Sequence, residues 1–228
     1  MNYPLLSDMK KCLLLLTICL YMISCNNVGN KTVRQETVVQ EYNDEMEIVE
    51  CKSDKNIPNG LALGKVVEFK GKTKEETNML SQFKSYNTAL LRGDIDNAKH
   101  YMYKDAVVYF RKFYPGIGDD AISNKFFESV SKEMVGQIRR FESHGVELEL
   151  VVSRIIRKVT QGDNIFYIFE IVSNMFNDNL QLHTTPDLTL AISSNSGKNW
   201  TFNAMNEDTP NILRVSHSDD VVDKIMGY

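Results

Sequence analysis

Residues 146–205 read VELELVVSRIIRKVTQGDNIFYIFEIVSNMFNDNLQLHTTPDLTLAISSNSGKNWTFNAM, and this stretch decides the fold. Its first part, from Val146 to Ser153, alternates apolar with polar residues, a period of two that is typical of a half-buried β-strand. The alternation changes phase near Val151–Val152, which predicts a β-bulge and a bend in the strand. The whole stretch predicts three or four long antiparallel strands, the only large sheet that the sequence indicates.

The middle of this stretch predicts a hairpin with a charged pair at its centre. Gln161-Gly162-Asp163 is typical of a turn, and residues 165–176 are apolar on both faces, as in a central strand. A three-residue turn centred on Gly162 pairs positions that sum to 324, which places Glu170 opposite Arg154. Two interpretations follow. The pair is a structural ion pair, or Glu170 is a general base at the floor of a pocket.

The end of the stretch alternates most regularly. From Leu180 to Ser193 the leucines share one face and the polar residues share the other, so His183 and Asp187 are expected to face solvent. Pro186 cannot donate a hydrogen bond to a ladder and therefore marks an edge or a bulge. Trp200 is expected on the apolar face of the last strand.

The N-terminus carries a different signal. Lys10-Lys11 precede an apolar run from Cys12 to Ile23 that is too short to span a bilayer but fits the core of a secretory signal. Ser24-Cys25 follows, and the segment resembles a bacterial lipoprotein signal, in which a small residue precedes a lipidated cysteine. The alternative is an ordinary secretory signal with an incidental cysteine. The resemblance implies a lipid anchor at Cys25 in the cell envelope, with the outer membrane as the expected location.

The chain is therefore expected to have three parts. Residues 1–25 are the signal, residues 26–60 form a polar tether, and residues 61–228 form one domain with a C-terminal helical extension. Val38-Val39 and Met46–Val49 are the only apolar patches of the tether and could form a short strand.

Composition limits the classes of function. The chain has 228 residues, 43% of them hydrophobic, which is enough for a core and excludes global disorder. The net charge of −4 argues against a nucleic-acid partner. Once the signal is removed and Cys25 is acylated, Cys51 alone remains, so no internal disulfide is expected. Without a CxxC or Cys/His cluster, no metal or cofactor is expected either. Met9 is an alternative start to Met1.

Helical patterns precede the sheet. Thr73-x-x-Glu76 is typical of a capping box, and the helix that it opens carries Tyr86 on its apolar face and ends at Gly93. Asp94 is expected to cap a second, short helix. Further expected elements are a strand over 106–113, a long amphipathic helix over 119–143, and C-terminal helices that start at 208–210 and 218–220.

Two segments, SYNTALLRGDID at 85–96 and YKDAVVYF at 103–110, resemble the nuclear-transport-factor-2-like group, which includes ketosteroid-isomerase-like and SnoaL-like proteins. In that group a first helix ends at a Gly-Asp, and the chain runs through a second helix into a first strand. The resemblance covers residues 73–206. It implies an α+β fold, a cone-shaped, cystatin-like roll whose curved antiparallel sheet wraps the long helix, with a pocket at its open end. It also implies a possible homodimer through the outer sheet face.

The candidate pocket consists of Glu170, Arg154, Tyr86 and Trp200. Enzymes of the group place an Asp or His base and a Tyr donor inside the cone, and no pair here matches them residue for residue, so no catalytic residue is assigned. The leading hypothesis is a lipid-anchored, non-catalytic domain that binds an unidentified small ligand or a protein. The alternatives are an assembly or dimerisation module, and an isomerase- or dehydratase-like enzyme with Glu170 as its base.

Overall fold

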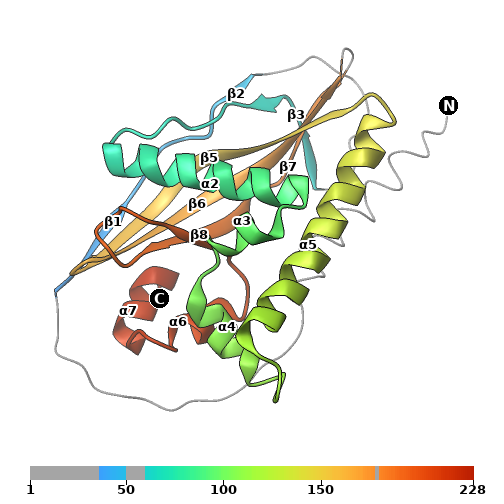
Figure 1. Ribbon diagram of the computed structural model, residues 1–228. Coiled ribbons are helices and arrows are strands. Elements are labelled where there is room, and N and C mark those ends of the chain that lie inside the picture. The colour runs from blue at the N-terminus through green and yellow to red at the C-terminus, as the bar shows by residue number, and fades with distance from the viewer. Residues whose placement is uncertain (1–35, 50–59, 178–179) are drawn as a thin grey trace.

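The computed structural model describes residues 36–49, 60–177 and 180–228, and within them the chain is an α+β domain with a mostly antiparallel sheet (Figure 1). The main sheet has the strand order β1-β5-β6-β7-β3, with β8 between β6 and β9. The strands are β1 Thr37–Glu41, β2 Ile48–Val49, β3 Leu61–Leu63, β4 Lys65–Val66, β5 Glu147–Gln161, β6 Asn164–Asn177, β7 Leu180–Thr184, β8 Asp187–Ser193 and β9 Thr201–Ala204. The helices are α2 Lys74–Arg92, α3 Ile95–Lys99, α4 Lys104–Arg111, α5 Asp119–Glu142, α6 Thr209–Leu213 and α7 Asp219–Met226.

The hairpin β5–β6 is the centre of the sheet, and it confirms that Arg154 faces Glu170. The turn is shorter than expected, because Gln161 already pairs with Asn164. A register shift between Ile155 and Arg157 then moves the pairing by one position, so the expected pair forms. A second shift, between Val152 and Arg154, lies next to the predicted bulge.

The expected long strand over 180–193 is divided into two. β7 and β8 both pair with β6, and the break at Thr185-Pro186 fits the expectation that Pro186 marks a bulge or an edge. β3 pairs with β7, whereas β9 pairs with β8. Leu182, Leu190 and Trp200 are buried as expected, but Leu188, which was expected on the same face as Leu190, is 39% exposed, and Thr189 on the expected polar face is buried.

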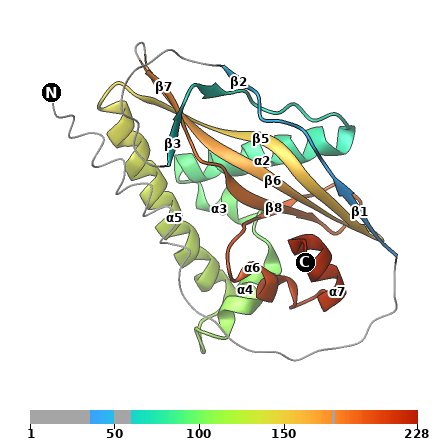
Figure 2. The ribbon, with the colours of Figure 1, turned by 180° about the vertical axis from the view of Figure 1, so that it is seen from behind.

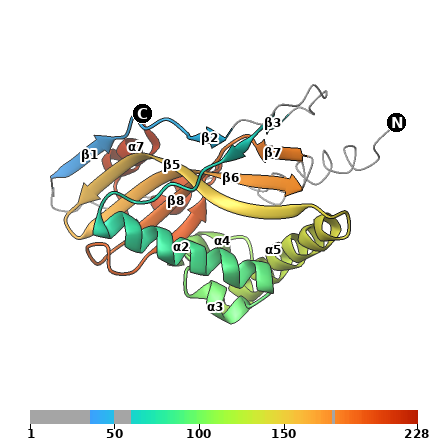
Figure 3. The ribbon, with the colours of Figure 1, turned by 90° about the horizontal axis from the view of Figure 1, so that it is seen from above.

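Helices cover the two faces of the sheet unequally (Figures 2 and 3). One face packs on α2, through a cluster that includes Phe83, Tyr167 and Phe169. The opposite face packs on α4, α6 and α7, through a cluster that includes Phe166 and Ile225. Both faces of β6 are therefore buried, as its continuous apolar sequence predicts.

The long helix α5 lies across one end of the sheet (Figure 1). Its Phe127 packs among Leu90 and Ala98, which belong to α2 and α3, and its Phe141 packs on a small cluster that includes Met175 at the end of the sheet. The middle of the sheet therefore rests on α2, and α5 supports α2, α3 and α4. Among the described residues, no helix has both the length and the apolar sequence needed to cross a bilayer.

The predicted helix signals are confirmed. Thr73 accepts a hydrogen bond from the backbone N–H of Glu76, and the Glu76 side chain accepts one from Thr73 N–H, which completes the capping box. Gly93 closes α2 with a φ of 72°, a conformation that suits glycine because it has no Cβ. Asp94 caps α3 through its side chain.

The strand expected over 106–113 is wrong, because these residues form α4 and the turn after it. Val107-Val108 are β-branched and favour a strand, but Ala106, Tyr109 and Phe113 recur at helical spacing and pack against the C-terminal helices. Tertiary burial of that stripe outweighs the local preference. The nuclear-transport-factor-2-like pattern needs a strand at this position, so the segment departs from it.

Parts of the expected tether belong to the fold. Its two apolar patches form β1 and β2, which pair with β5 and β4, so the short strand expected there is confirmed. The expected domain, which begins at residue 61, opens with β3 and β4. The signal segment 1–25, with Cys25, lies outside the described residues.

Candidate functional site

Glu170 and Arg154 form a closed ion pair. Arg154 Nε and Nη2 donate to the two carboxylate oxygens of Glu170 at 2.8 Å each, and Ser153 Oγ donates to Glu170 Oε2 at 3.4 Å. Arg154 Nη1 also donates to the carbonyl of Asp44 at 3.3 Å. The hydrogen bonds to Glu170 raise the pKa of Arg154 above its usual value. The arrangement matches the interpretation as a structural ion pair. A carboxylate whose two oxygens both accept hydrogen bonds from a guanidinium group is a poor general base.

Tyr86 and Trp200 lie on the other face of the sheet, among packed aromatic rings. Tyr86 stacks on Phe202 with ring centroids 5.6 Å apart, and burial raises the pKa of its hydroxyl. Trp200 is 1% exposed, and its Nε1 donates to the carbonyl of Gly197 at 3.1 Å.

The four residues of the expected pocket therefore do not come together. Glu170 shares a face with Ile168, which packs on the C-terminal helices, whereas Trp200 packs on the opposite face with α2, the helix that carries Tyr86. The sheet separates Glu170 and Arg154 from Tyr86 and Trp200. On the face that α2 covers, side chains fill the space expected for a pocket. Tyr86 lies on helix α2 and Trp200 lies between β8 and β9, so alternation within β5 and β6 could not show which face of the sheet these two residues cover.

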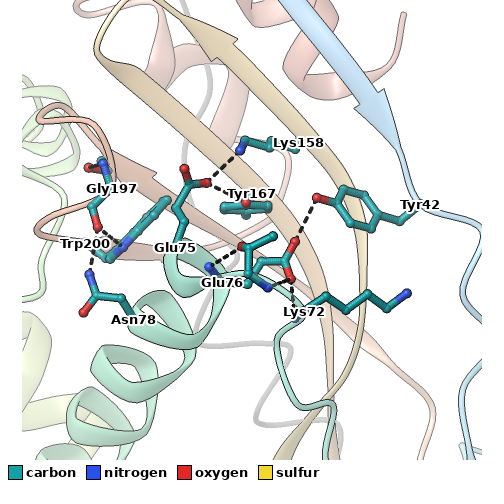
Figure 4. Close-up of polar contacts among 11 residues, drawn as sticks. Tyr42, Lys72, Glu75, Glu76, Asn78, Lys158, Tyr167, Gly197 and Trp200 are labelled. Carbon is teal, nitrogen blue, oxygen red and sulfur yellow. Dashed lines mark hydrogen bonds and ion pairs between the residues drawn. The ribbon is translucent and has the colours of Figure 1, made fainter.

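A polar cluster that the sequence did not predict lies at the start of α2 (Figure 4). Glu75 Oε1 accepts hydrogen bonds from Tyr167 OH at 2.6 Å and from Lys158 Nζ at 2.8 Å. Lys158 Nζ also lies 5.3 Å from the centroid of the Tyr167 ring. Burial, with added effect from Glu75, raises the pKa of Tyr167, so its hydroxyl stays a donor. The carboxylate thus joins α2 to the central hairpin.

Glu76 makes the adjacent connection, to the N-terminal segment (Figure 4). Its Oε1 accepts from Tyr42 OH at 3.0 Å, and its Oε2 accepts from the backbone N–H of Lys72 at 2.6 Å and of Thr73 at 3.1 Å. Glu76 is 1% exposed, so these donors replace the water that a buried carboxylate needs. Burial and the contact with Glu76 raise the pKa of Tyr42 to about 12. The pair fastens the segment after β1 onto α2.

Tyr103 is the centre of a third cluster, between α4 and the connection from α6 to α7. Its hydroxyl donates to Asp105 Oδ2 at 2.7 Å and lies 3.2 Å from His217 Nε2 and 3.3 Å from Ser216 Oγ. Ser216 Oγ donates to Asp105 rather than to His217. Burial lowers the pKa of His217 and raises that of Tyr103. A serine nucleophile needs its base within hydrogen-bond reach, and here the serine proton points to the carboxylate instead.

His183 corrects a further expectation. It is 3% exposed rather than solvent-facing, because β3 and the turn after it cover that face, and its Nδ1 lies 3.1 Å from the carbonyl of Gly64. Asp187, by contrast, is exposed as expected. Among the described residues, no group of three or more His, Cys, Asp or Glu side chains could hold a metal ion.

A one-position error in the expected register concealed the pairing of Lys158 with Tyr167. A pairing sum of 324 places Lys158 opposite Phe166, whereas its partner in the structure is Tyr167. The capping-box signal at Thr73 and Glu76 was present, but it indicated a helix start and not the contact with Tyr42. That contact joins residues 34 positions apart, and no local pattern predicts it.

Comparison of the chain with models of protein families, with curated proteins and with solved structures finds no match.

Proposed function

We propose that this protein is a lipid-anchored component of the bacterial cell envelope whose domain binds other protein chains and has no catalytic role. The supports for the anchor are the basic pair at 10–11, the short apolar run after it, and the small residue before Cys25. A nuclear-transport-factor-2-like ancestry remains part of the proposal. The succession of α2, α3, α5 and a long antiparallel hairpin supports it, and α4 departs from it.

A small-ligand pocket in the core receives no support, because aromatic rings fill the α2 side of the sheet. Phe83, for example, contacts Phe169 and Phe202 edge-on, with ring centroids 4.9 and 5.1 Å away. The enzyme alternative, with Glu170 as base, is also unsupported, because Arg154 donates hydrogen bonds to both carboxylate oxygens of Glu170. Surface elements are therefore the better candidates for binding.

The observation that carries the proposal is the exposed edge of the sheet at β1. Only β5 pairs with β1 among the described strands, so no described strand covers the outer edge of β1. Val38 is 59% exposed and Val39 is 41% exposed, on a strand whose neighbouring side chains point to opposite faces. Proteins usually protect such an edge with charges, prolines or a covering segment, and an unprotected apolar edge favours strand addition.

A second copy of the chain is the partner that this edge fits. Antiparallel pairing centred on Val39 would place Val38 opposite Gln40 and Thr37 opposite Glu41, so no two like charges would face each other. Anchoring two copies to one membrane would raise their effective concentration and favour the pair.

The experiment is sedimentation of the full-length processed protein in a non-ionic detergent, for the wild type, Val39→Lys and Val108→Lys. The two valines have similar exposure, 41% and 37%, but Val108 lies on α4, far from the edge. We expect the wild type and Val108→Lys to form dimers and Val39→Lys to be monomeric. A wild-type protein that stays monomeric at high concentration would remove the assembly role.

The anchor is tested separately in a bacterial host. Metabolic labelling with a radioactive fatty acid should mark the wild type and leave Cys25→Ala unlabelled, and the variant should leave the membrane fraction or remain unprocessed. Equal labelling of both proteins would show that Cys25 is not the acylated residue.

A further inference from the structure

An open groove of about 630 Å³ lies between α5 and the junction of α2 with α3. One wall is a stripe of α5 in which residues recur at helical spacing over about three turns. The other wall is the end of α2 and the start of α3. The residues that line it are Arg92, Gly93, Ile95, Glu128, Ser131, Lys132, Val135, Gly136 and Arg139.

The charge of this groove is opposite to that of the protein. The chain has a net charge of −4, yet the groove presents Arg92, Lys132 and Arg139 against a single acid, Glu128. Within the described part of the chain, neither Arg92 nor Arg139 has an ion pair or a hydrogen bond from its side chain. Every other described arginine has a partner, namely Arg111, Arg140, Arg154, Arg157 and Arg214. The two arginines that remain available for binding thus line the same groove.

The floor of the groove is apolar and open. Ile95 and Val135 are half-buried there, and a Cβ added at Gly136 would meet no atom within 4 Å. Ser131 Oγ is already engaged, because it donates to the carbonyl of Leu90 at 3.0 Å. The groove therefore offers cationic rims above a surface that excludes water when covered.

The spacing of the cations indicates the shape of the ligand. Lys132 and Arg139 are seven positions apart on α5, which corresponds to about 10 Å along the helix. A single small anion would contact both only if the two side chains bent toward each other, whereas carboxylates spaced along a polypeptide can contact them in extended conformations. The planar guanidinium group binds carboxylates with two hydrogen bonds, so arginine suits this role.

We propose that this groove binds an acidic segment of a partner protein, with Arg92 and Arg139 as its main contacts. Acidic side chains of the segment would contact the rims, and its apolar side chains would cover Ile95 and Val135. The groove lies at the opposite end of the molecule from β1 (Figure 3), so this site is independent of the proposed pairing of two copies.

The test is fluorescence anisotropy with a fluorescein-labelled peptide of alternating glutamate and leucine. Full-length protein in non-ionic detergent is compared with Arg92→Gln/Arg139→Gln and with Lys84→Gln/Lys198→Gln. The second pair removes the same charge from exposed residues outside the groove and is the matched control. We expect the arginine pair to weaken binding about tenfold or more, since each charge-assisted hydrogen bond at an exposed rim has a modest effect and two of them are removed together. The lysine pair should bind like the wild type.

Each of four outcomes would overturn the proposal. Equal weakening by both double variants would mean that only net charge matters, and no binding of the peptide at low salt would mean that the groove is not a site for acidic chains. If inorganic phosphate displaced the peptide, the cations would be assigned to a different anion. The same would follow if the peptide did not bind but phosphatidylglycerol vesicles bound through Arg92 and Arg139. The dimerisation test with Val39→Lys does not depend on any of these results.

Discussion

Arg154 and Glu170 face each other across the central hairpin, and both nitrogens of the guanidinium fork, Nε and Nη2, bind the carboxylate at 2.8 Å. The Glu170 side chain is 10% exposed, whereas that of Arg154 is 37% exposed. The pair thus keeps a carboxylate inside the sheet by covering it with a cation that still reaches solvent. The contribution of this ion pair to the free energy of unfolding depends on how well Glu170 is solvated when Arg154 is removed.

We expect Arg154→Met to lower the free energy of unfolding by about 2 kcal/mol, because it removes both guanidinium donors from a buried carboxylate that keeps the weaker contact from Ser153. Arg214→Met is the matched control. Arg214 has a similar exposure of 35%, but its partner Asp219 is 76% exposed and can bind water instead. The control should cost less than about 1 kcal/mol. Urea unfolding measures both values, and equal losses would show that burial of Glu170 does not matter.

Tyrosines should limit stability at alkaline pH. Burial raises the pKa of Tyr42 to about 12 and raises those of Tyr86, Tyr103 and Tyr167 above the ordinary value of 10. Since the folded pKa lies above the unfolded one, this stability is fully present below pH 10 and is lost as the pH rises beyond it. Absorbance of tyrosinate during a pH titration should show a group of tyrosines that ionise only when the protein unfolds.

One of these tyrosines can be tested alone. Tyr42→Phe removes the donor to buried Glu76, and we expect a loss of about 1 kcal/mol at neutral pH. Tyr228→Phe changes a residue that is 83% exposed and should have no effect. If Tyr42→Phe is as stable as the wild type, the segment after β1 is not held by this contact.

His217 should make the protein sensitive to acid. Burial lowers its pKa from the ordinary value of 6.5, although Asp105 opposes the change, so the folded state prefers the neutral imidazole. The unfolded chain then binds the proton first, and stability that is present above pH 6.5 declines as the pH falls below it. His217→Gln should reduce this decline between neutral and mildly acidic pH in thermal unfolding. His100→Gln, at an exposed position, should leave the decline unchanged.

Two glycines should respond to alanine in opposite directions. Gly93 has a φ of 72°, which strains any residue with a Cβ, so Gly93→Ala should cost about 1 kcal/mol. A Cβ there would meet only Ser131 Oγ, at an ordinary 3.5 Å, so the loss comes from the backbone and not from a clash. Gly136 lies inside α5 with open space around it, and Gly136→Ala should stabilise by about 0.5 to 1 kcal/mol. Chemical denaturation of both variants checks the signs.

The sheet could be predicted largely from alternation, but the pairing of Arg154 with Glu170 was right for an unexpected reason. The turn at Gly162 is one residue shorter than expected, and the shift between Ile155 and Arg157 compensates for it before Arg154 is reached. Between the turn and that shift every pairing was displaced by one position. Alternation shows which side chains share a face, but it does not fix the length of a turn or the position of a bulge.

Helix α4 shows where local preference fails. Val107-Val108 favour a strand in isolation, and the packing of Ala106, Tyr109 and Phe113 against the C-terminal helices makes the helix the better state. The candidate site failed for a related reason. Glu170 is buried and Tyr86 is half-buried, and contacts between distant segments decide which face of the sheet each of them occupies.

Strand β1 completes the sheet with a partner far along the chain, since Glu41 and Arg157 are ion-paired across 116 positions of sequence. During synthesis, the first strand leaves the ribosome long before β5 exists, and the edge of the sheet cannot form until nearly three quarters of the polypeptide has been made. For a protein that is exported as proposed, β1 would therefore stay unpaired while it passes through a translocation channel. It would pair with β5 only after the β5–β6 hairpin has also crossed the membrane.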